Sequence, residues 1–173
     1  MNVTATLRNL HGNKVGAAIE ELHRSENELA GELINLSDQH KVDHEVFYVA
    51  RDIARWSQEH VRMLAEVGRD YGLDLDPEPE GDGSLLARVK RKGAELTGRY
   101  HEPGLLLLAS LRHIHRSAAG VSLDWEVLAQ TAQAMKDEKL LALAQDCHPQ
   151  TLRQLRWANG KVKETSAQLM VTG

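Results

Sequence analysis

A seven-residue apolar repeat constrains the fold of this chain most strongly, because an acidic residue interrupts it at an inward position. The repeat advances in alternating steps of four and three, the spacing that keeps one face of a helix against its neighbours. Its first positions are Val15, Ile19, Leu22, Glu26, Leu29, Leu33 and Leu36. The pattern therefore predicts a helix from about Asn13 to Leu36 that directs the Glu26 carboxylate into the core.

A second run of the same repeat follows after a short polar turn. Its positions are Val42, Val46, Val49, Ile53, Trp56, His60, Met63 and Val67. Asp43 is suited to cap the start of this helix, which we expect to extend to about Tyr71 and to end at Gly72. His60 lies on the inward face, so two neighbouring helices direct ionisable groups inward. Buried charge is costly unless it is paired, hydrogen-bonded or bound to a metal.

The middle of the chain predicts a long crossover connection, over residues 73–102. Leu73 to Ser84 is rich in proline, glycine and acids and cannot form a regular element. Leu85 to Arg99 is basic and predicts a short helix, broken or weakened at Gly93. A connection of this length can cross the full length of a helical bundle.

Two further long helices complete the expected architecture. Pro103 suits the first turn of the third, and a turn near Lys136 and Asp137 leads into the fourth, where Pro149 predicts a kink or local unwinding. The inward positions expected for the third helix are Leu107, Leu111, Ile114, Ala118, Val121, Trp125, Leu128, Ala132 and Met135. Those of the fourth are Leu140, Ala144, Cys147, Thr151, Leu155, Ala158, Val162, Thr165 and Leu169.

Composition bounds the class of protein. A chain of 173 residues fits a single domain, 1–173. A formal net charge of −4 argues against nucleic acid or an anionic membrane as a partner. The single cysteine, Cys147, excludes an internal disulfide, and no apolar run reaches the roughly 20 residues of a membrane span. The N-terminal residues do not form a secretory signal, so we expect a cytoplasmic protein.

Four long helices, paired first with second and third with fourth around a long crossover, resemble the ferritin-like superfamily. The resemblance implies an all-α, antiparallel four-helix bundle with a short extra helix in the crossover. It also implies a di-iron or di-manganese centre held by a carboxylate from each of two helices and a Glu-x-x-His from each of the other two. Because such bundles often associate, it favours a homodimer.

The residues that could carry this metal chemistry are Glu26, Glu59, His60, His23 and Glu126. The interval from Glu26 to Glu59 is the one that the family implies, and His23 closes a Glu-x-x-His that begins at Glu20. Arg62 stands three residues after Glu59, where the family has a histidine. The fourth helix has no Glu-x-x-His; its only histidine is His148.

Each inward group also has a structural interpretation. Glu26 can form a buried ion pair or hydrogen bond, for which Arg55 is one expected partner, and His60 can bond as a neutral ring to a carbonyl or carboxylate. A turn centred near His40 offsets Glu26 and His60 by six residues, about 9 Å along the axis, which places them too far apart to share one ion. Trp125 needs a polar neighbour for its indole N–H, whereas Trp157 falls off the inward face and suggests a contact surface.

Three functions remain open from the sequence. The first is a non-enzymatic oligomeric or partner-binding protein with a degenerate metal site, without a catalytic residue or cofactor. The second is an oxidoreductase or iron-handling protein that uses iron or another divalent metal at a non-standard carboxylate and histidine site. The third, nucleic-acid binding through the basic run Arg88 to Lys92, ranks below both, because the acidic stretch before it can neutralise it.

Overall fold

The computed structural model describes residues 3–78, 83–100 and 102–172, and over these residues the chain is all-α. The helices are α1 (Val3–Gln39), α2 (His44–Gly68), a 3-10 turn η1 (Arg69–Tyr71), α3 (Gly83–Arg99), α4 (Pro103–Met135) and α5 (Glu138–Thr172). No strand occurs in the described part of the chain, so the all-α prediction is confirmed. No described helix is both long enough and apolar enough to cross a membrane.

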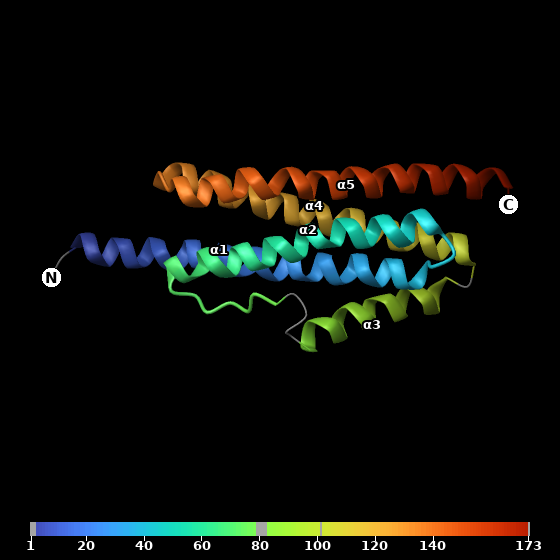
Figure 1. Cartoon of the computed structure of the whole chain (residues 1–173), viewed down its shortest axis with the longest axis horizontal. Coiled ribbons are helices and arrows are strands. Elements are labelled where there is room, and N and C mark those ends of the chain that lie inside the picture. Colours follow the sequence, from blue (N-terminus) through green and yellow to red (C-terminus); the bar gives the residue numbers. More distant parts are fainter. Residues whose placement is uncertain (1–2, 79–82, 101, 173) are drawn as a thin grey trace.

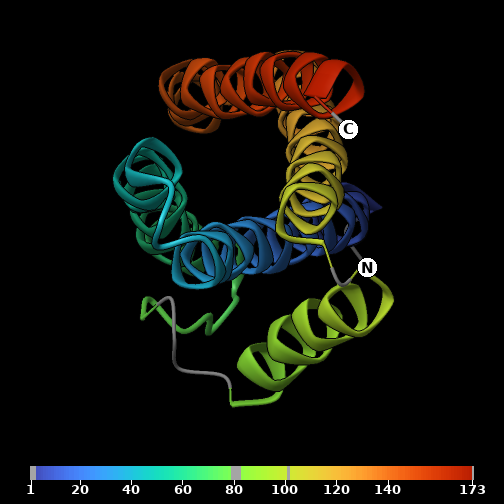
Figure 2. The same ribbon diagram turned by 90° about the vertical axis from the view of Figure 1, so that its right-hand side faces the viewer.

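The four long helices lie side by side, and each runs antiparallel to its neighbours (Figure 1). The pairs in contact are α1 with α2, α4 with α5, α1 with α4 and α2 with α5. The segment after η1 and then α3 lead from one end of these helices to the other, and α3 lies outside them against α1 and α4 (Figure 2). The helix Gly83–Arg99 thus lies in the chain between the second and third long helices, where the sequence predicts a short one.

The ends of the helices follow from local hydrogen bonds. Asp43 caps α2 by accepting a hydrogen bond from the Val46 N–H at 3.0 Å, as expected. Gly72, with φ of 76°, reverses the chain after η1. Asp137 accepts from the Leu140 N–H at 2.9 Å at the start of α5, and it also accepts from the Tyr71 hydroxyl. This last bond ties the turn before α5 to the end of η1.

Three helices are longer or more regular than the sequence suggests. α1 begins at Val3 rather than near Asn13. α3 continues through Gly93, so the helix is not broken there. The glycine faces α1, where a Cβ would lie 2.5 Å from Nδ2 at the end of the Asn35 side chain. α5 is helical on both sides of Pro149 and through it, without the local unwinding that we expected.

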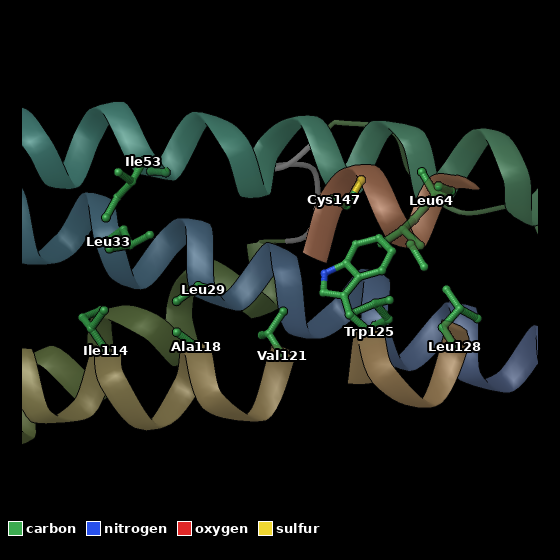
Figure 3. Close-up of a cluster of buried hydrophobic side chains, with 14 of the residues drawn as sticks. Leu29, Leu33, Ile53, Leu64, Ile114, Ala118, Val121, Trp125, Leu128 and Cys147 are labelled. Atoms are coloured by element: carbon green, nitrogen blue, oxygen red, sulfur yellow. The ribbon is translucent and has the colours of Figure 1, made fainter. Parts of the chain in front are cut away.

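A common apolar core joins the four long helices (Figure 3). The inward positions of α1 are all buried, as predicted. On α2 the prediction fails at Val42, which is 96% exposed in the turn before the helix, because the buried face runs through Val46, Ala50, Ile53 and Ser57. Met135 at the end of α4 is also exposed. Trp157 is half-buried and packs against the core, so it is not the exposed contact that we expected.

Candidate functional site

A layer of polar side chains crosses the apolar core, and its centre is Glu26 of α1. Its carboxylate is fully buried. Oε1 accepts hydrogen bonds from His60 Nδ1 at 2.8 Å, Trp125 Nε1 at 2.6 Å and Thr151 Oγ1 at 3.1 Å. The three donors come from α2, α4 and α5, so one carboxylate oxygen connects all four long helices.

The prediction that Arg55 pairs with Glu26 is wrong. Arg55 is exposed and pairs with Asp52 at 3.3 Å, because it lies on the outer face of α2. The expected 9 Å separation of Glu26 from His60 is wrong as well. Glu26 lies thirteen residues before the end of α1 and His60 sixteen residues after the start of α2, so their axial offset is only about 4.5 Å. Two inward side chains span this distance.

His60 faces oxygen acceptors at both ring nitrogens. Nδ1 lies 2.8 Å from Glu26 Oε1 and Nε2 lies 3.0 Å from Gln150 Oε1. With the Gln150 amide oxygen directed at Nε2, as in this structure, neither oxygen can donate, so both nitrogens act as donors and the ring is an imidazolium; the opposite amide orientation would pair its NH2 group with a neutral ring. Burial opposes the charged ring, but the Glu26 carboxylate, together with the neighbouring Cys147 side chain, outweighs it and raises the pKa of His60 to about 10. His60 is therefore a charged partner of Glu26 rather than the neutral ring that the sequence suggested.

The electrostatics of Glu26 agree with this assignment. Burial alone would raise the pKa of the carboxyl, but the charge and hydrogen bond of His60 and the indole N–H of Trp125 hold it below its usual value. The indole ring also meets the imidazole edge-on, with ring centres 5.5 Å apart. The polar neighbour expected for Trp125 is thus Glu26 itself.

Further polar residues extend the layer between α2 and α5. Gln154 Nε2 donates to the Ile53 carbonyl and to Ser57 Oγ, each at 2.9 Å, and Cys147 Sγ lies 3.9 Å from Met63 Sδ. Sequence reasoning missed Ser57, Gln150 and Gln154. Each glutamine comes three residues after an inward position of α5: Gln150 after Cys147, and Gln154 after Thr151. The sequence feature that could have revealed them is this polar stripe beside the inward face of α5.

The other residues expected at a metal centre lie elsewhere. Glu59 is exposed and pairs with Arg62 at 3.1 Å, and Glu126 is exposed on α4. His23 donates from Nε2 to the Asp76 carbonyl at 2.8 Å, outside the layer. Of the five candidates only Glu26 and His60 meet, and they bond to each other. Among the described residues, no three His, Cys, Asp or Glu side chains are grouped so as to hold a metal ion.

A second buried charge, which sequence reasoning also missed, fixes α3 to the rest of the molecule. Glu32 is 5% exposed, and its Oε1 accepts from His113 Nε2 at 2.8 Å and Lys92 Nζ at 3.3 Å. Burial would raise the pKa of Glu32, but His113 and Lys92 lower it overall. Lys92, the last residue of the basic run, is therefore paired within the chain, although its partner is on α1 and not in the acidic loop.

Comparison with known proteins adds no identity: no family model, no curated protein and no solved structure matches this chain.

Proposed function

We propose that this chain is a ferritin-like four-helix bundle whose metal centre is degenerate, and that it acts without catalysis as an oligomeric or partner-binding protein. The order of the helices, the antiparallel neighbours and the long crossover support the ferritin-like assignment. Inward residues from all four long helices meet at Glu26, where a bundle of that class would hold its metal.

The observation that carries the proposal is the engagement of both nitrogens of His60 as donors. A histidine binds a metal through a ring nitrogen that carries a lone pair, and here Glu26 and Gln150 occupy both nitrogens as acceptors. Glu26 in turn accepts three hydrogen bonds on one oxygen. The residues present therefore do not fit a di-iron site, and the pair stabilises the bundle instead.

Iron loading tests this proposal. The purified protein is incubated with ferrous iron, desalted and submitted to elemental analysis, beside the double variant Glu26→Ala with His60→Ala and the surface control Glu59→Gln. We expect no stoichiometric iron in any of the three and no oxygen or peroxide turnover. Iron retained by the parent and the control but lost from the double variant would contradict it.

One observation favours the second candidate, a metal-binding oxidoreductase or iron-handling protein. Oε2 of Glu26 is buried and forms no hydrogen bond of normal length within the described residues, although the Ser57 hydroxyl lies near enough to the carboxylate to lower its pKa; a buried carboxylate oxygen in this position attracts a water or a cation. A cation that also bound the His60 ring would have to displace a proton from one of its nitrogens. The same iron analysis separates the two functions.

The partner surface that we propose is the outer face of α4, and the partner is a second copy of the chain. Leu123 and Val127 lie one helical turn apart and are 62% and 58% exposed. Light scattering coupled to gel filtration should show a dimer that the double variant Leu123→Asp with Val127→Asp dissociates. The control Val171→Asp, at an exposed valine near the end of α5, should leave it intact. A monomeric parent would contradict the homodimer.

A further inference from the structure

The outer face of α4 carries a second stripe with the spacing of a helix-packing surface. Its residues advance in steps of four and three, as the inward positions of α4 do, but they lie on the opposite side of the helix and all are exposed. No described helix covers this side of α4 (Figure 2). The stripe consists of Arg116, Gly120, Leu123, Val127, Gln130 and Ala134.

The stripe contains a hole next to a protruding side chain. A Cβ built on Gly120 would meet no atom within 4 Å, so the helix backbone is open to solvent at this point. No neighbour in the described chain requires the small size of this residue, although glycine weakens the interior of a helix. One turn further along, Leu123 projects into solvent and is 62% exposed. A knob and a hole on one exposed helix face are the elements of packing between two helices.

Two unpaired charges flank the knob and the hole. Arg116 and Glu126 are exposed, and neither forms a hydrogen bond or ion pair with another described residue. Within one copy they are about 15 Å apart along α4, too far to pair with each other. When two α4 helices pack antiparallel with Leu123 of one copy over Gly120 of the other, Arg116 lies level with Val127 of the other copy. Glu126 is then one residue, or about 1.5 Å, from the level of that arginine.

We propose that two copies of the chain pair through antiparallel α4 helices, with Leu123 of each copy seated on Gly120 of the other. Arg116 of each copy then pairs with Glu126 of the other, so opposite charges meet twice around the two-fold axis. The proposal rests on the dimer proposed above and gives its geometry. Sliding the helices by two turns, so that Leu123 faces Val127, would bring the two Glu126 carboxylates to about the same level, and their repulsion disfavours that register.

Reversal of the two charges tests this geometry. Sedimentation equilibrium at about 0.15 M salt measures the dissociation constant of the dimer, and circular dichroism checks that each variant is folded. Arg116→Glu and Glu126→Arg should each weaken the dimer about tenfold or more, because each turns two attractions into two repulsions. The double variant that carries both reversals restores the opposite charges, and its dissociation constant should return to within about threefold of the parent value.

Two matched controls and a steric variant accompany the reversals. Arg62→Glu and Glu59→Arg make the same charge changes at exposed positions of α2, which does not pack against α4 in the described chain, and both should dimerise as the parent does. Gly120→Leu fills the hole. Because the space around this glycine is open within one copy, the variant should fold normally but weaken the dimer about tenfold or more.

The outcomes separate this register from the dimer on which it rests. A monomeric parent, or a dimer that survives Leu123→Asp with Val127→Asp, would contradict the proposed dimer itself. If those two substitutions dissociate the dimer but neither charge reversal weakens it, the dimer stands and the antiparallel register is wrong. A double reversal that dimerises no better than the single ones would overturn the register as well.

Discussion

Replacing Glu26 by glutamine should reveal how much the buried charge pair stabilises the fold. Glutamine keeps an oxygen for the Trp125 and Thr151 donors but removes the charge that holds the proton on His60. Breaking a buried pair costs about 3–5 kcal/mol, and the retained acceptor reduces this, so we expect a loss of about 2–4 kcal/mol in the free energy of unfolding near neutral pH. Urea denaturation measures it.

The pH dependence of the unfolding free energy shows whether the charge on His60 is the cause of this loss. The pKa of His60 is raised from its usual 6.5 to about 10 in the folded protein. A raised pKa stabilises the fold fully below the unfolded value and loses this contribution as pH rises toward the folded value. Between about pH 7 and about pH 9.5 the parent should therefore lose roughly 1 kcal/mol of unfolding free energy per pH unit.

The variant Glu26→Gln is the control for this loss of stability with rising pH. In Glu26→Gln the burial of His60 is no longer opposed by a carboxylate, so the steep alkaline loss should be absent and the two proteins should converge as pH rises. Glu59→Gln, at the neighbouring exposed position, should change stability by less than about 0.5 kcal/mol. Identical slopes in the parent and in Glu26→Gln would refute the assignment of His60 as a charged partner of Glu26.

Three further substitutions test the layer, the core and a helix end, each by urea denaturation. Trp125→Phe keeps an aromatic ring but removes the indole donor to Glu26, and it should cost about 2–3 kcal/mol; a change below about 0.5 kcal/mol would show that this bond does not matter. Leu29→Ala empties a fully buried site between the helices and should cost about 2–5 kcal/mol, whereas parent-like stability would contradict the packing. Asp43→Ala removes the cap of α2 and should cost about 1 kcal/mol. Unchanged stability would show that the cap does not form in solution.

The sequence predicts the helices well because their apolar periodicity is long and regular. Seven inward positions of α1 fall where the repeat places them, and the start of α4 at Pro103 and the cap at Asp43 follow from local chemistry. Gly93 misleads because glycine weakens an isolated helix, whereas here its missing side chain allows α3 to approach Asn35. Such a close approach is a tertiary property that no local pattern contains.

The candidate site is predicted only in part. Glu26 and His60 stand out because a charge on an inward position is unusual, but their contact depends on the axial register of α1 and α2. This register depends on where the turn between the two helices begins and ends. The predicted turn made the axial offset of Glu26 and His60 three residues too large, so Arg55 was expected as the partner of Glu26 in place of His60. Gln150 and Gln154 were missed because uncharged polar residues beside a core position resemble an ordinary helix flank.

The most direct test of the central claim is the protonation state of the His60 ring. Nitrogen-15 NMR of the imidazole at about pH 8 distinguishes a ring with two N–H groups from a neutral tautomer with one. If Glu26 and His60 form a structural charge pair, both nitrogens should carry protons, and the ring should titrate only near its raised pKa of about 10. A neutral ring with a free nitrogen at that pH would contradict the account and would return His60 to the role of a metal ligand.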